Sequence, residues 1–129
     1  MLEVNIPFDC ENAPKKKILA DFNIAFAKGQ VDEIASHLAD DIVWEMVGDK
    51  TVKGISEIKA LLEEMADYIA EGLDIHQIIT HGKDASVRGE LRFKNESIAF
   101  ADFYEFSSAG SKKIKRLISY AIPFKANAE

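Results

Sequence analysis

The chain has 129 residues, 47% of them hydrophobic and 29% charged, with a formal net charge of −6 at pH 7. These values favour one globular domain over residues 1–129, with residues 1–12 as a terminal arm, and the negative charge argues against binding nucleic acid through its phosphates. No apolar run is long enough to cross a bilayer, and the single Cys10 cannot form an internal disulfide, so we expect a cytoplasmic protein.

Three helices are predicted in the first half of the chain. The first begins near Pro14, which suits a first helical turn, and ends at Gly29. It carries one apolar stripe at helical spacing, made of Ile18, Leu19, Phe22, Ala25 and Phe26. A second, short helix is expected at residues 31–38. A third follows Gly54, with an apolar stripe that continues to Ile69 and a stop at Gly72.

Strands are predicted from the change of hydrophobic period. Residues 42–47 form a short β-branched run before a turn at residues 48–50. From residue 73 onward four runs follow, at residues 73–81, 85–93, 97–107 and 113–124, and the short links between them favour antiparallel neighbours. Helices followed by a meander indicate an α+β fold, with the helices packed on one face of a curved sheet.

Asp102 is the most informative candidate site residue. Strand alternation places it on one side with four large apolar or aromatic neighbours: Ile98, Phe100, Tyr104 and Phe106. A carboxylate among such side chains is costly unless it has partners or takes up a proton. It is therefore either a site residue or a structural carboxylate held by a backbone amide or an arginine, and the residues alone leave both interpretations open.

Two segments and a glycine carry a resemblance to a known family. Residues 22–34 (FNIAFAKGQVDEI) are followed by residues 38–45 (LADDIVWE), and Gly54 precedes the next helix. This pattern resembles the nuclear-transport-factor-2-like (NTF2-like) superfamily, in particular its ketosteroid isomerase and SnoaL-like polyketide cyclase branches. The resemblance extends from about Pro14 to Phe124. It implies a cone, in which a strongly bent antiparallel sheet wraps around three helices and leaves a deep apolar pocket at the wide end. It also implies a homodimer through the outer face of the sheet.

The catalytic roles of ketosteroid isomerase carry over only in part. The neutral aspartic acid falls on Asp102, but the tyrosine donor falls on Phe22 and the aspartate base on Met46. Since Phe22 has no hydroxyl and Met46 cannot accept a proton, steroid isomerisation by that mechanism is not expected.

SnoaL-like cyclases use an aspartate with a histidine in the cone, and three histidines are available here. His37 is expected at the surface, and at most one of His76 and His81 is expected to face the pocket, because they lie on opposite faces of one strand.

A pocket lining follows from the alternation anchored on Asp102 and from the resemblance. The expected ligand-binding residues are Phe22, Phe26, Trp44, Met46, Val87, Leu91, Phe100, Tyr104 and Ser119. The apolar members have core packing as their alternative role. Trp44 needs an acceptor for its indole N–H if it is buried, and a direct hydrogen bond to Asp102 is a hypothesis that would keep the carboxylate charged.

The resemblance favours a small enzyme of the isomerase, cyclase or dehydratase type, in which Asp102 acts as acid or base on an apolar carbonyl or polyketide-like compound. One alternative is a non-catalytic binding protein for a small hydrophobic ligand, and another is an interaction scaffold. An inward histidine, or Tyr104 within hydrogen-bond range of Asp102, would favour the enzyme. Trp44 as the sole partner of Asp102 would favour binding, and a filled cone would favour the scaffold. No cofactor, nucleotide or metal motif is recognised.

Overall fold

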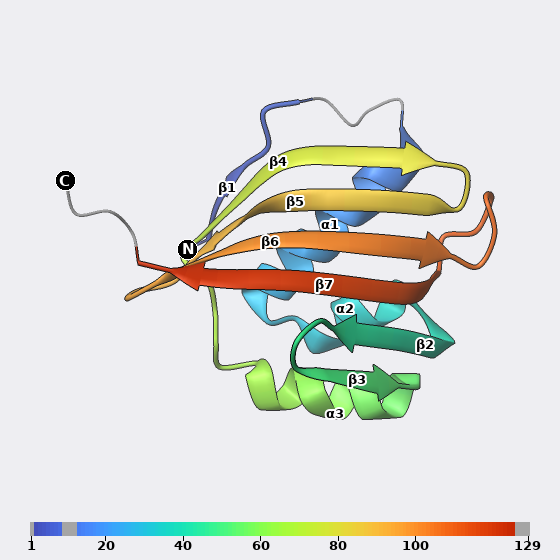
Figure 1. Ribbon diagram of the computed structural model, residues 1–129, viewed down its shortest axis with the longest axis horizontal. Helices are drawn as coiled ribbons and strands as arrows, with labels where there is room; N and C mark the ends of the chain where they lie inside the picture. Colours follow the sequence, from blue (N-terminus) through green and yellow to red (C-terminus); the bar gives the residue numbers. More distant parts are fainter. Residues whose placement is uncertain (1, 9–12, 126–129) are drawn as a thin grey trace.

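Three helices lie on one face of a seven-stranded sheet in the computed structural model, which describes residues 2–8 and 13–125 (Figure 1). The helices are α1 (Pro14–Lys28), α2 (Val31–Ser36) and α3 (Ile55–Met65). The strands are β1 (Glu3–Asn5), β2 (Leu38–Met46), β3 (Lys50–Lys53), β4 (Gly72–His81), β5 (Asp84–Arg92), β6 (Ser97–Phe106) and β7 (Ile114–Phe124). This arrangement confirms the α+β class, while Cys10 lies outside the described residues.

The sheet has the strand order β1-β4-β5-β6-β7-β2-β3. Strands β4 to β7 form the predicted antiparallel meander. However, β1 pairs with β4 and β2 pairs with β7 in parallel, so the sheet is mixed rather than antiparallel throughout. Long connections separate the members of both parallel pairs, as parallel pairing requires: all three helices lie between β1 and β4, and α3 with four strands lies between β2 and β7.

The strand prediction was too short around the first hairpin. β2 begins at Leu38 instead of residue 42, and the segment after the turn forms β3, which was not predicted. Trp44 pairs with Val52 across this hairpin. Val52 is the one apolar residue of β3, so the hydrophobic pattern of this segment does not indicate a strand. The strand forms because the segment pairs with β2.

The third helix was predicted too long. It ends at Met65, and Ile69 lies beyond it with 57% of its surface exposed. The backbone N–H of Ala70 instead donates to the carbonyl of Ala27, at 3.1 Å, which holds this connection against the end of α1.

Gly29 ends α1, as predicted, with a φ of 68°. A Cβ at this position would come within 2.8 Å of the Ala66 carbonyl oxygen.

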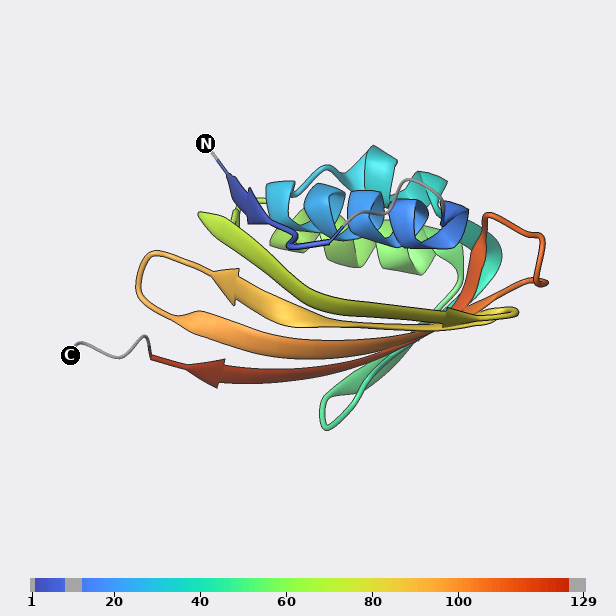
Figure 2. The ribbon, with the colours of Figure 1, turned by 90° about the horizontal axis from the view of Figure 1, so that it is seen from above.

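The sheet curves, so that it lies close to the helices at one end and diverges from them at the other (Figure 2). A bulge between Ile75 and Gln77 interrupts the pairing of β4 with β5. Gly89 sits opposite this bulge, and a Cβ there would lie 2.1 Å from the carbonyl oxygen of Asp74. Only glycine therefore permits this close approach of the two backbones.

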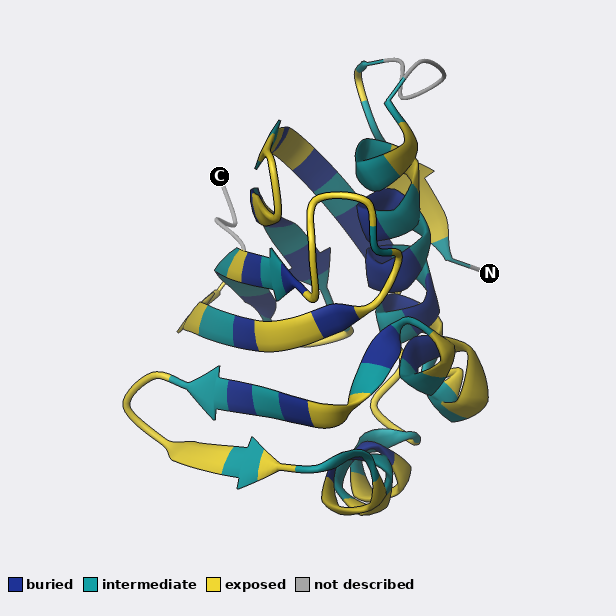
Figure 3. Ribbon diagram, turned by 90° about the vertical axis from the view of Figure 1, so that its right-hand side faces the viewer, coloured by how far each residue is buried: buried dark blue, intermediate teal, exposed yellow. Residues whose placement is uncertain are grey.

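Buried and exposed residues alternate along the long strands (Figure 3). The inner face carries the core, and its largest fully buried side chains include Leu19, Phe22, Ile42, Ile75, Phe106, Ile114 and Leu117. No helix of the described chain is long and apolar enough to cross a membrane.

The outer face of the sheet keeps several apolar side chains in contact with solvent. Phe103 is 48% exposed and packs edge-on against Tyr120, which is 46% exposed, and Ile122 is 67% exposed. The homodimer expected through this face remains a prediction. A sedimentation mass twice that of one chain would confirm it, and the mass of one chain would contradict it.

Candidate active site

A cavity of about 430 Å³ lies between the helices and the inner face of the sheet, within the size range of small-molecule sites. The helices contribute Phe22, Asn23, Phe26 and Met65 to its wall, and the connection after α3 contributes Tyr68. The sheet and its turns contribute Trp44, Met46, Val47, Asp49, Leu91, Phe93, Ile98, Phe100, Asp102, Leu117, Ser119, Tyr120 and Ala121. The wall is thus mostly apolar, with Asp102 among its few polar groups.

Most of the predicted lining residues meet at this cavity. Asp102 is joined there by Phe22, Phe26, Trp44, Met46, Leu91, Phe100 and Ser119. Val87 is fully buried and does not line the cavity, because its side chain belongs to the packed core beside Asp102. Tyr104 is also buried behind the wall, at 2% exposure, and reaches the site only through its hydroxyl.

Asp102 receives a hydrogen bond from within its own strand. The Tyr104 hydroxyl donates to Oδ2 of Asp102 at 3.2 Å, because the two side chains lie two residues apart on one face of β6. Behind Tyr104, the amide nitrogen of Asn23 on α1 donates to the tyrosine oxygen at 3.1 Å. Helix and sheet are therefore joined by polar contacts at the wall of an otherwise apolar cavity.

The hypothesis of a direct bond between Trp44 and Asp102 was wrong. The indole Nε1 of Trp44 donates instead to Oγ of Ser119, at 2.9 Å. Ser119 on β7 stands opposite Asp102 on β6, so its hydroxyl lies beside that carboxyl and lowers the pKa of Asp102. The register of three neighbouring strands thus inserts a serine between the tryptophan and the aspartate.

The surroundings of Asp102 favour its protonated form more than water does. Burial raises the pKa of Asp102 from 3.8 to about 6, although the hydrogen bonds from Ser119 and Tyr104 lower it. Burial and the neighbouring charge of Asp102 also raise the pKa of Tyr104 well above its usual value. At neutral pH the site therefore pairs an ionised carboxylate, which is readily protonated, with a tyrosine that keeps its hydrogen.

Asn23 is a polar residue of the site that the sequence analysis missed. It is 6% exposed, lines the cavity, and donates a second hydrogen bond to the carbonyl of Leu19, at 2.8 Å. A signal was present, since an asparagine at this position shares the helical stripe of Leu19, Phe22 and Phe26. Asp49 and Tyr68 were missed as well, because their contribution depends on how a turn and a helix end fold back over the cavity.

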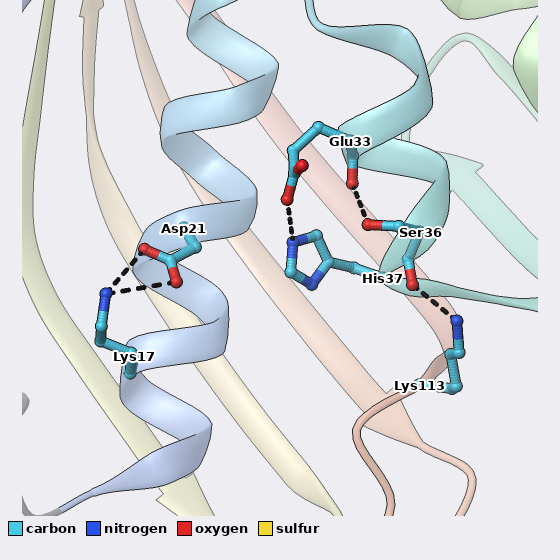
Figure 4. A network of polar contacts seen from close by, with 6 residues as sticks. All are labelled: Lys17, Asp21, Glu33, Ser36, His37 and Lys113. Carbon is cyan, nitrogen blue, oxygen red and sulfur yellow. Dashed lines mark hydrogen bonds and ion pairs between the residues drawn. The ribbon is translucent and has the colours of Figure 1, made fainter.

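None of the histidines lines this cavity. His76 and His81 are exposed, and Nε2 of His76 lies 3.4 Å from the carboxylate of Glu90. The expectation of a surface position for His37 was wrong, because only 16% of its side chain is exposed and its ring packs edge-on against Phe22. Its Nε2 faces a Glu33 carboxylate oxygen at 3.5 Å (Figure 4).

In the part of the chain that the structure describes, no group of three His, Cys, Asp or Glu side chains could hold a metal ion. The site offers a partly buried acid, two neighbouring hydroxyls and apolar surface. Such a set can move a proton and can bind the apolar body of a small molecule.

The sequence matches a known family model over most of its length. Residues 19–117 match the model of the SnoaL-like domain. No curated protein matches the chain.

Solved structures resemble the whole fold. An NTF-2-like protein of unknown function from Burkholderia xenovorans LB400 has a TM-score of 0.74 and 16% identity over 93% of this chain and 92% of its own. The epoxide hydrolase/cyclase-like enzyme SalBIII, named for pyran ring formation in the polyether salinomycin, has a TM-score of 0.72 and 17% identity over 88% and 95%. An LEH-like epoxide hydrolase from M. tuberculosis has a TM-score of 0.67 and 22% identity over 82% and 80%. At these identities the likeness shows the NTF2-like fold.

Proposed function

Because the chain belongs to the SnoaL-like domain family, we propose that it is a small-molecule enzyme in which Asp102 performs acid–base chemistry. The substrate is an apolar carbonyl or polyketide-like compound that occupies the cavity. The observation that carries this proposal is the contact of 3.2 Å between the Tyr104 hydroxyl and the Asp102 carboxylate, at the wall of an open apolar cavity. A second polar group within reach of the acid favours catalysis over passive binding.

The chemistry follows from the protonation behaviour of Asp102. With a pKa of about 6 the carboxylate is ionised at neutral pH, and its proton affinity is matched to that pH. It removes a proton from the carbon next to a carbonyl, and the electron pair of the broken C–H bond moves into the enolate. The protonated Asp102 then returns the proton to another atom of the substrate. The two steps balance without any oxidant or reductant.

The charges around the cavity favour a neutral substrate. Among the described residues that line it there are two carboxylates, Asp49 and Asp102, and no lysine or arginine. A carboxylate or phosphate on the substrate would meet repulsion without a compensating cation. A ketone, an ester or a polyketide-like chain meets the apolar wall without this cost.

The names of two similar structures support chemistry of this general kind. One is an epoxide hydrolase/cyclase-like enzyme and the other an epoxide hydrolase. For this chain we propose the common element, an acid–base group in the cone, and not a particular one of these reactions.

Exchange of hydrogen for deuterium next to a carbonyl tests the proposal without knowledge of the natural substrate. The probe is the aromatic ketone 2-tetralone in D₂O, followed by proton NMR. The wild-type protein is expected to accelerate the exchange, and Asp102→Asn is expected to lower that acceleration by about 10²–10⁴. The matched control is Glu45→Gln. Glu45 lies on the face of β2 that points away from the cavity, where it pairs with Arg116 at 3.8 Å. This variant removes a negative charge outside the site and is expected to leave the exchange rate unchanged.

The alternative function, a non-catalytic binding protein, predicts a different outcome. The fluorescence of Trp44, which lines the cavity, would change with added 2-tetralone, and the exchange rate would stay at that of buffer. That combination would contradict the enzyme and favour the binding protein. An absence of both binding and exchange for a panel of aromatic ketones, esters and polyketides would contradict both functions.

A further inference from the structure

Two hydroxyl groups flank Asp102, one on each side. Tyr104 lies on the same strand, and Ser119 lies opposite on β7. A hydroxyl can donate or accept a hydrogen bond, so neither group alone determines which way its hydrogen points. What lies behind each hydroxyl therefore decides whether Asp102 is held as an acceptor.

Behind Tyr104 lies an amide whose orientation is fixed. Asn23 contacts the carbonyl oxygen of Leu19 at 2.8 Å, and a carbonyl can only accept, so the group that faces it is the amide nitrogen. The same nitrogen lies 3.1 Å from the Tyr104 oxygen, to which it can only donate. The tyrosine oxygen accepts this bond, and its single hydrogen is left for the carboxylate.

Behind Ser119 lies the indole of Trp44, which is buried at 5% exposure. An indole N–H can only donate, and it lies 2.9 Å from the Ser119 oxygen. The serine oxygen therefore accepts from the tryptophan, and its own hydrogen is left for Asp102. The two sides of the carboxylate thus have the same construction, a donor-only group behind a hydroxyl.

We infer, on the basis of the proposed function, that Asn23 and Trp44 are positioning residues for Asp102. Each turns the hydrogen of a neighbouring hydroxyl toward the carboxylate, so the aspartate is presented to the substrate as a proton acceptor. This contrasts with the carboxylic acid that ketosteroid isomerase holds neutral as a hydrogen-bond donor. Two converging hydrogens stabilise the anion against the apolar wall and keep a base available at neutral pH.

The titratable groups around Asp102 are few, which makes the effect measurable. Tyr104 faces it from the same strand, and Asp49 lines the same cavity from the turn between β2 and β3. Tyr68 and Tyr120 also line this cavity. Burial, Ser119 and Tyr104 account for the altered pKa of Asp102. A change in either hydroxyl should therefore be read directly in the titration of this carboxyl.

The test is a carbon NMR titration of the Asp102 carboxyl in the whole protein, without substrate. Asn23→Leu removes the donor behind Tyr104, and Trp44→Phe removes the donor behind Ser119. In each variant the released hydroxyl is free to turn away, so the pKa of Asp102 should rise by about 0.5–1. Asn23→Ala replaces Asn23→Leu if the larger side chain prevents folding.

Combined variants separate positioning from a general effect on structure. Asn23→Leu should change nothing further in a protein that already carries Tyr104→Phe, but should keep its full effect beside Ser119→Ala. Trp44→Phe should change nothing further in a protein that carries Ser119→Ala, but should keep its full effect on the pKa beside Tyr104→Phe. An equal rise in both backgrounds would mean that Asn23 or Trp44 acts on the fold in general, and an unchanged pKa in both single variants would mean that neither orients a hydroxyl. Either result overturns the inference.

Failure of this inference and failure of the proposed function are distinguishable, because the titration needs no reaction. If the pKa responds as expected but 2-tetralone does not exchange, positioning holds and the enzyme proposal fails. If exchange depends on Asp102 but the pKa ignores both donors, the enzyme proposal holds and positioning fails.

Discussion

The two ends of the space between helices and sheet are built from the same strands, yet one end is filled and the other is hollow. At the closed end Leu19, Phe106 and Ile114 have no exposed surface. At the open end the sheet bends away from the helices (Figure 2). A cavity of about 430 Å³ remains, with Asp102 in its wall. Strand β6 contributes to both ends, since Phe106 lies four residues beyond Asp102 on the same face.

This comparison shows that alternation selects the inner face of a strand but does not determine what fills the space in front of it. The closed end is stabilised by close packing, whereas the open end holds a carboxyl group at the expense of stability. Substitutions at the two ends should therefore change stability by different amounts, and for Asp102 in the opposite direction.

The largest expected difference comes from removing an aromatic ring at each end. Phe106→Ala should lower the free energy of unfolding by about 3–5 kcal/mol, because it opens a new cavity in a packed region. Phe26→Ala should cost only about 1–3 kcal/mol, because Phe26 is partly buried and already borders a hollow. Urea denaturation measures both values, and equal losses would mean that the open end is packed as tightly as the closed one.

A smaller effect on stability is expected from the acid itself, and its size depends on pH. The pKa of Asp102 is about 6 in the folded protein against an ordinary 3.8, so the folded state holds this proton more tightly than the unfolded chain. The stabilising contribution of the proton is complete below pH 3.8 and is lost as the pH rises through 6. A buried charge then remains, with a cost of at most about 3 kcal/mol.

Asp102→Asn removes this titration and should stabilise the protein at pH 7 by about 1–3 kcal/mol, with little gain at pH 4. Unfolding by urea at several pH values, in wild type and variant, gives the difference. Other titrating groups, such as Glu105 beside Lys83, are present in both proteins and cancel. A difference that does not vary between pH 4 and 7 would contradict the raised pKa.

Local patterns predicted the inner wall well. The alternation through Asp102 placed Phe100 and Leu91 at the cavity, because side chains two residues apart share a face and the register between strands extends that face across the sheet. The inward position of Ser119 came from the family resemblance, and the cavity includes this residue as well. The helical stripe likewise placed Phe22 and Phe26 toward the sheet.

What the sequence could not provide depends on contacts between distant segments. β3 has a weak pattern of its own and forms by pairing with β2, and α3 ends before its apolar stripe does because Ala70 is held by α1. The insertion of Ser119 between Trp44 and Asp102 depends on the register of three strands. The amide of Asn23 finds its partner on β6, 81 residues away, which no local period can indicate.

The most direct test of the account is the carbon NMR titration of Asp102 in the unmodified protein. A carboxyl group that faces an apolar hollow and is held by two hydroxyls should titrate with a pKa of about 6. A midpoint at or below 3.8 would mean that water or an unrecognised cation reaches the group freely, and Asp102 would then be an ordinary structural carboxylate.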